Sequence, residues 1–118
     1  MSEKAFERYL PLSETTYYIM LALAEPRHGY AVMQHTVQVS GGRVKLGPGT
    51  LYGAITKLLA EKVIVPQPGG EDDGERRKIY VLTALGRQVL QAEYDRLQEM
   101  VRHGSAVLPA AAASKEKK

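Results

Sequence analysis

The sequence predicts a mainly α-helical domain with a small β-hairpin, and three observations support this fold class. Apolar residues recur at helical spacing in four separate segments. Between the third and fourth segments, a β-branched run and an alternating run flank a glycine-rich stretch, as in an antiparallel hairpin. The length of 118 residues, with 44% hydrophobic and 25% charged residues, fits one globular domain.

The first two helices are marked by signals at their ends. Ser13 is typical of an N-cap and precedes a strongly apolar helix over residues 14–25, which Pro26 ends. With few polar positions, this helix is expected to be buried on more than one side. A shorter amphipathic helix over residues 30–39 follows, and the paired glycines at 41–42 end it.

The third helix, predicted over residues 47–62, has the clearest pattern. Gly47 suits the N-cap, and Pro48 suits the first helical position, where its missing N–H is no loss. The opposite side from its apolar face is small, hydroxylated or cationic, so no carboxylate there would meet phosphate. This helix is a candidate for DNA recognition, and a core helix with a solvated face is the alternative. Its predicted buried face consists of Leu51, Ile55, Leu58 and Leu59.

Two strands and a long helix complete the pattern. Residues 63–65 and 76–82 predict the strands of the hairpin, and Thr83 caps a helix that runs to about His103. A helix of that length spans roughly 30 Å, longer than a domain this small can cover. Its uncovered apolar stripe needs another surface, most simply the same helix of a second subunit. The residues assigned to this dimer contact are Val89, Leu90, Tyr94, Leu97, Met100 and Val101.

This order of elements is typical of a winged helix-turn-helix, here with an added C-terminal dimerisation helix. In that fold the third helix enters the major groove and the hairpin, called the wing, lies along the phosphate backbone. We therefore predict a DNA-binding domain over residues 1–82, a dimerisation helix over 83–103 and a disordered tail over 104–118. The charges agree, because residues 27–65 hold five cations and one carboxylate, which favours a polyanionic partner.

Several function classes do not fit the sequence. Without cysteine there is no disulfide, thiolate metal site or cysteine nucleophile. The histidines His28, His35 and His103 lack a metal-ligand spacing, and neither a nucleophile elbow nor a glycine-rich phosphate loop occurs. We expect no enzyme, no metal and no cofactor. No apolar run reaches the length of a signal peptide or membrane span, so a cytoplasmic protein without membrane contact is expected.

Four separated motifs resemble the PadR family of bacterial transcriptional regulators and occur in the right order over roughly residues 11–100. They are His28-Gly29-Tyr30, Pro48-Gly49-Thr50-Leu51-Tyr52, the run 57–65 and the run 76–86. The resemblance implies a homodimeric repressor of the branch with a single C-terminal helix, which supplies most of the dimer contact. Its partners would be a double-stranded, near-palindromic operator and, as in some members, a small aromatic effector that releases the DNA.

The resemblance and the residue chemistry together give a candidate set for DNA contact. His28 and Tyr30 match the motif at the start of the second helix, where helix N-termini bind phosphates. In the third helix, Lys57 is expected to touch phosphate, whereas a core position is the alternative for Tyr52, as it is for Tyr30. The full set is His28, Tyr30, Thr50, Tyr52, Thr56, Lys57, Arg76, Arg77 and Lys78.

The sequence departs from the family pattern at the helix start and in the wing. Gly47 stands where Ser is frequent, which weakens the cap by a few tenths of a kcal/mol. The carboxylates at 71–73 and 75 would be repelled by phosphate, so wing contacts should come from residues 76–78. There is no tryptophan, so the multidrug sensing of some relatives, which stacks drugs on tryptophan, is not expected.

Two other hypotheses remain open at this stage. One is a winged helix that binds protein rather than DNA. The other is a ligand pocket between the first and last helices, for which packing in a dimer core is the alternative. The aromatic residues assigned to that pocket are Phe6, Tyr9, Tyr17, Tyr18 and Tyr94.

Overall fold

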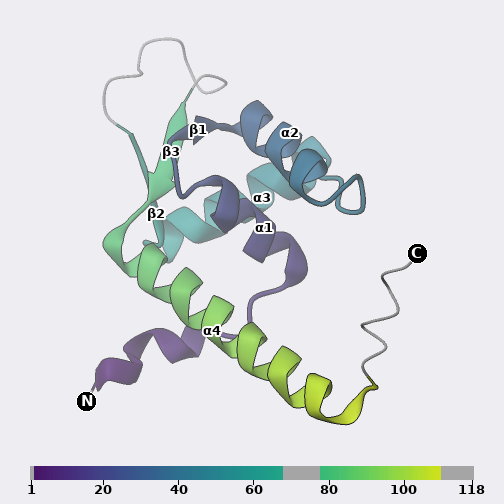
Figure 1. The fold of residues 1–118 in the computed structure, drawn as a ribbon. Helices are drawn as coiled ribbons and strands as arrows, with labels where there is room; N and C mark the ends of the chain where they lie inside the picture. Colours follow the sequence, from purple (N-terminus) through teal and green to yellow (C-terminus); the bar gives the residue numbers. More distant parts are fainter. Residues whose placement is uncertain (1, 68–77, 110–118) are drawn as a thin grey trace.

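The structure, a computed structural model, describes residues 2–67 and 78–109. It is mainly helical with one small sheet, as predicted, and α4 runs below α1 and the sheet with η1 beside it (Figure 1). In chain order the elements are η1 (Ser2–Tyr9), α1 (Glu14–Ala22), β1 (Arg27–His28), α2 (Gly29–Val39), α3 (Pro48–Ala60), β2 (Ile64–Pro66), β3 (Ile79–Leu82) and α4 (Ala84–Val107).

The sheet has three strands in the order β1-β3-β2, where the sequence predicted a two-stranded hairpin. The additional strand, β1, pairs antiparallel with β3 through only two residues, which is too short to produce an alternating pattern. β2 is an edge strand, and this allows Pro66 to lie within it opposite Tyr80 although proline cannot donate to a ladder.

Three helix ends differ from the prediction. α1 ends at Ala22 rather than residue 25, and the carbonyl of Leu23 instead accepts from the amide of Leu82 at 2.9 Å, which ties the chain to β3. α3 ends at Ala60 because Lys62 adopts a left-handed φ of 66° and turns the chain into β2. α4 continues past His103 to Val107.

The predicted caps are confirmed in detail. The Ser13 hydroxyl accepts from the amide of Thr16, and the Thr83 hydroxyl accepts from the amide of Gly86, each at 3.0 Å. Gly47 is the N-cap of α3 without a side-chain bond, followed by Pro48 at the first helical position. Caps depend on neighbours in the sequence, which is why local patterns identify them.

One hydrophobic core joins the helices and the sheet. On α3, Leu51, Ile55 and Leu58 are buried as predicted, and Leu59 packs partly against them. Val89 is 1% exposed and belongs to this core, which corrects its assignment to the dimer contact, because a second subunit cannot reach it. The core residues are Ile19, Met20, Ala22, Leu23, Val32, Val44, Leu46, Leu51, Ile55, Leu58, Val63, Ile64, Tyr80, Leu82 and Val89.

α2 and α3 meet at a close contact between Gly29 and the ring of Tyr52. A Cβ atom added to Gly29 would lie 2.4 Å from the Tyr52 hydroxyl oxygen and 2.8 Å from Cζ. Such approaches are too short for any side chain, so glycine is required while the tyrosine ring keeps this position. The first residue of α2 therefore fixes where the Tyr52 ring lies on α3.

We predict that Gly29→Ala destabilises the protein by about 1–3 kcal/mol, because overpacking displaces the Tyr52 ring. In a Tyr52→Ala background the same change should cost little, giving a coupling energy of about 1 kcal/mol or more in a double-mutant cycle. Urea unfolding measures all four proteins. Gly53→Ala is the matched control, since open space surrounds that position and alanine favours the helix. Equal costs of Gly29→Ala in both backgrounds would contradict the packing described.

Candidate nucleic-acid interface

The exposed side of α3 carries two ridges of side chains with a smooth strip between them. Thr50 and Lys57 lie two turns apart on one flank, and Tyr52 and Thr56 lie one turn apart on the other. Between them, Gly49 and Gly53 would have nothing within 4 Å of an added Cβ. These six residues are here called the recognition face. They form a polar surface along one side of α3, and none of them carries a carboxylate.

Two side chains of the recognition face already bond residues four positions away in sequence. The Thr56 hydroxyl donates to the backbone carbonyl of Tyr52 at 2.9 Å, so its oxygen still has acceptor capacity. Lys57 Nζ lies 3.1 Å from Glu61 Oε2, and its side chain is 73% exposed. An exposed pair of this kind contributes only about 0–1 kcal/mol, so phosphate can replace Glu61 at small cost.

The start of α2 adjoins the recognition face through Tyr52. His28 caps α2 by accepting from the amide of Ala31 at its Nδ1, 3.4 Å away. In the neutral ring Nε2 then carries the proton and can donate. Tyr30 is 59% exposed and Tyr52 40%, so Tyr30 is not a core residue, while Tyr52 is both packed and accessible. His28, Tyr30 and Tyr52 thus surround the positive end of a helix dipole.

Two cations that the candidate set omitted lie immediately before α3. In the segment 43–46, Val44 and Leu46 are buried, whereas Arg43 and Lys45 are exposed. Arg43 forms an ion pair with Glu14, so we do not assign it a contact with DNA. Lys45 has no ion pair within the described part of the chain. The alternating pattern of this segment indicates that both cations are exposed, but not that Arg43 is the one already paired.

The wing is described only at its base. Lys78 is exposed next to the first residue of β3, in the position expected of a wing cation. Arg76 and Arg77, like the carboxylates at 71–73 and 75, lie outside the described residues. Of the nine candidates, Thr50, Tyr52, Thr56 and Lys57 lie on the exposed side of α3, and His28 and Tyr30 lie at the start of α2, which contacts Tyr52 through Gly29. Lys78 lies at the wing base, and Arg76 and Arg77 have no described position.

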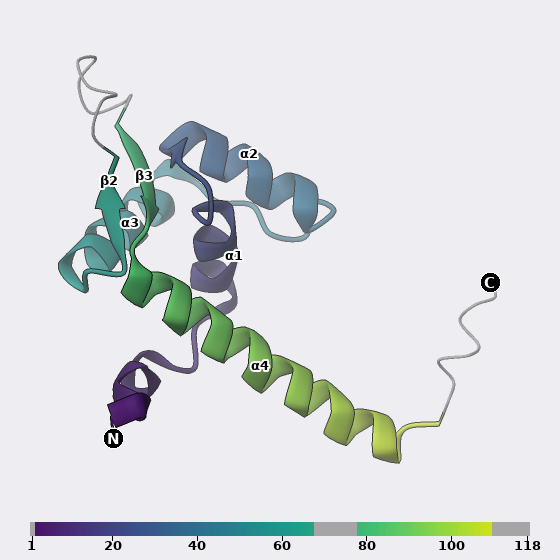
Figure 2. The same cartoon turned by 60° about the vertical axis from the view of Figure 1, so that its left-hand side comes forward.

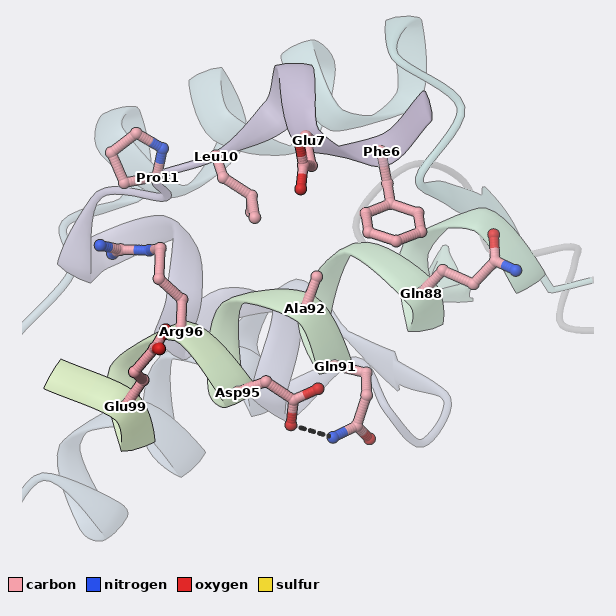
Figure 3. A pocket seen from close by; sticks show the side chains of 10 residues that line it. All are labelled: Phe6, Glu7, Leu10, Pro11, Gln88, Gln91, Ala92, Asp95, Arg96 and Glu99. Carbon is pink, nitrogen blue, oxygen red and sulfur yellow. Dashed lines mark hydrogen bonds between the residues drawn. The ribbon is translucent and has the colours of Figure 1, made fainter. Parts of the chain in front are cut away.

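The aromatic residues do not share one pocket, which corrects that hypothesis. Phe6 lines a groove of about 670 Å³ between η1 and α4 (Figure 3), and Tyr9 lines a different cavity of about 220 Å³. Tyr17 and Tyr94 share a third groove, of about 440 Å³, between α1 and α4. Tyr18 instead accepts from Arg43 at 3.4 Å.

The last groove has one cation, Arg87, beside its two tyrosines. The Arg87 guanidinium donates to the carbonyl of Ala24 at 3.0 Å. Partial burial, with Tyr94 and Glu93 nearby, raises the pKa of Tyr17, so its hydroxyl stays neutral. The two tyrosine rings can stack on a flat anion, and the Tyr17 hydroxyl and the Arg87 guanidinium can donate hydrogen bonds to it.

Neither a metal centre nor a membrane segment is found in the part of the chain that the structure describes. Across residues 2–67 and 78–109, no three His, Asp or Glu side chains gather as they would around a metal ion. Over the same residues, no helix combines the length and apolar character that crossing a bilayer requires.

Comparison with known proteins supplies the family. The sequence profile described as the transcriptional regulator PadR-like family matches residues 19–92. The chain is 43% identical over 76 residues to an uncharacterized 37.1 kDa protein in transposon TN4556 of Streptomyces fradiae, of whose length it spans 20%. It is 31% identical over 72 residues to an uncharacterized protein of Lysinibacillus sphaericus, of whose length it spans 66%.

Solved structures agree in fold. A PadR-like transcription factor from Bacteroides fragilis is 30% identical, with a TM-score of 0.57 over 75% of this chain and 87% of that one. A PadR family regulator from Clostridium difficile R20291 is 22% identical, with a TM-score of 0.64 over 80% and 97%. BpsR of Bordetella bronchiseptica, whose DNA binding is regulated by 6-hydroxynicotinic acid, is 21% identical, with a TM-score of 0.63 over 92% and 80%.

These matches confirm the winged helix-turn-helix and the expectation that the chain is no enzyme, since the family consists of transcriptional regulators. The family profile spans α2, α3, the sheet and the first part of α4, which are the elements that carry the recognition face and its supports. The chain belongs to the PadR-like family of transcriptional regulators.

Proposed function

We propose that this protein is a repressor that binds a near-palindromic operator as a homodimer in the cytoplasm. The observation that carries the proposal is the recognition face of α3, which is exposed, polar and free of carboxylates. α3 enters the major groove, with the start of α2 and Lys78 of the wing base against phosphates. The central glycines let the helix backbone approach the base edges closely. A repressor would act by occupying a promoter.

The direct test is an electrophoretic shift with the DNA upstream of the coding region. Lys57→Ala should weaken binding to all DNA sequences alike and reduce the slope of log affinity against log salt by about one, because one phosphate contact is lost. Asp95→Asn is a control, since this exposed carboxylate lies on α4, away from the recognition face.

An unchanged salt slope in Lys57→Ala would remove Lys57 from the interface. Absence of any shift by the unmodified protein at low salt would contradict DNA binding altogether. The alternative function, a winged helix that binds another protein, would then be favoured.

The homodimer is supported by the apolar surface of α4. Beyond the core contacts, the helix extends away from the rest of the fold (Figure 2), and large apolar side chains are exposed along it. Leu90 and Leu97 are partly buried and continue the same stripe. The exposed members are Tyr94 (47%), Met100 (53%), Val101 (68%), Val107 (79%) and Leu108 (66%). A second α4 packed along this stripe would remove them from water.

We predict that Val101→Glu converts the dimer to a monomer at micromolar concentration, because the charge would be buried without a partner. Light scattering after size exclusion measures the mass. Ala106→Glu is the matched control, since it adds the same charge to an exposed position on the other side of α4 and should leave the dimer intact. Monomeric unmodified protein, or a Val101→Glu variant that remains dimeric, would argue against this interface.

We also propose a small aromatic acid as effector, held in the groove between α1 and α4. The support is the pair of tyrosines with Arg87 in that groove, together with the effect of 6-hydroxynicotinic acid on BpsR. An acid bound there would contact α1 and α4 at once and so change how the two are arranged.

The expected result is a rise in melting temperature of several degrees with 6-hydroxynicotinic or phenolic acids at about 100 times Kd. Arg87→Gln should abolish the rise, because the carboxylate loses its guanidinium partner. A screen in which none of these acids raises the melting temperature would leave the tyrosines as packing residues.

A further inference from the structure

Glu93 is a buried carboxylate in the middle of the apolar stripe of α4. It is 1% exposed, and it lies one turn beyond the core residue Val89. Removing a carboxylate from water is unfavourable unless it is paired and hydrogen-bonded, and an apolar residue would fill this position without that cost. The hydrogen bonds that the Glu93 carboxylate makes must therefore account for its presence at this position.

The carboxylate joins two parts of the chain that lie far apart in sequence. Arg96 donates to it twice, from Nε to Oε1 at 2.7 Å and from Nη2 to Oε2 at 2.8 Å. The backbone amide of Leu12 donates to Oε2 at 3.1 Å. Arg96 is one turn further along α4, whereas Leu12 immediately precedes the N-cap of α1. One side chain thus ties the segment between η1 and α1 to α4.

The three donors keep this carboxylate charged and in place. The Arg96 guanidinium, followed by the Leu12 amide, holds the pKa of Glu93 below its ordinary value despite the burial. Arg96 is itself placed beside Leu10 and Pro11, which line the groove between η1 and α4 with it (Figure 3). The attachment is therefore a charged, three-bond contact rather than a general packing contact.

Glu93 lies where α4 leaves the rest of the fold. It is the last buried residue of the helix, and from residue 98 to residue 108 every residue except Gly104 is exposed. The helix continues from Glu93 to Val107, a distance of about 21 Å at 1.5 Å per residue. A tilt of about 10° at Glu93 would therefore displace the far end by roughly 4 Å.

We propose that Glu93 is a positioning residue that fixes the direction of α4 relative to the winged helix, and so sets the distance between the two α3 helices of the homodimer. The inference rests on the proposed dimer and its operator. Glu93 itself touches no DNA. Its effect is on which spacing of two half-sites the dimer can bind, since both recognition faces must enter the major groove together.

The absence of cysteine from the chain gives a direct test. Ala60→Cys, at the exposed end of α3, carries a single nitroxide label, and pulsed electron paramagnetic resonance measures the label-to-label distance across the dimer. The parent should give one narrow distribution. Glu93→Gln keeps the shape of the side chain but loses the charge that Arg96 binds, and should widen the distribution at least twofold or shift it by about 4 Å.

Asp95→Asn is the matched control. It removes one negative charge from the same helix at an exposed position whose side chain bonds only Gln91 in the described structure (dashed in Figure 3), and its distribution should equal that of the parent. If circular dichroism shows that Glu93→Gln does not fold, Arg96→Lys takes its place in the distance measurement. Lysine keeps the charge but cannot form both bonds, so the same widening or shift of the distribution is expected.

A second readout uses DNA. Against operators whose half-sites are moved apart or together by one base pair, the parent should prefer one spacing, and Glu93→Gln should lose at least fivefold of that preference while binding a single half-site equally well. A folded dimeric variant with an unchanged distance distribution, or a parent that does not dimerise, would overturn the proposal. If Glu93→Gln widens the distribution relative to the parent but the parent binds no DNA, the positioning role is supported and the proposed function is contradicted.

Discussion

The burial of one face of α3 is the constraint on which the rest of the structure depends. Leu51, Ile55 and Leu58 enter the core, and this alone fixes which side chains of the helix remain outside. Thr50, Tyr52, Thr56 and Lys57 are exposed because they occupy the remaining positions of the same helical period. The orientation of α3 in the core thus determines both which of its residues are packed and which are available for the proposed DNA contact.

The parts that could be predicted from sequence are those determined by neighbours along the chain. The Ser13 and Thr83 caps, the Gly47-Pro48 start of α3 and its buried face all follow from local patterns. β1 was missed because two residues form a strand only through pairing with β3, more than 50 positions later. The early end of α1 has the same cause, since Leu23 bonds Leu82.

The candidate site was predictable to a similar extent. Exposure of the α3 residues followed from helical spacing, but Lys45 and Glu93 required knowledge of what surrounds them. Lys45 differs from the nearby cation Arg43 because Arg43 already forms an ion pair with Glu14. Glu93 falls on the helical spacing of the α4 core stripe, one turn after Val89, so the pattern placed a carboxylate in the core. Only the structure reveals its partner Leu12, which is 81 residues away.

Footprinting on an operator selected from random DNA shows most directly whether the paired α3 helices read DNA. We expect two major-groove patches protected from chemical cleavage or methylation on the same face of the duplex, with centres about one helical turn apart. Selection that enriches no sequence, or protection of one continuous backbone stretch without major-groove contact, would contradict it.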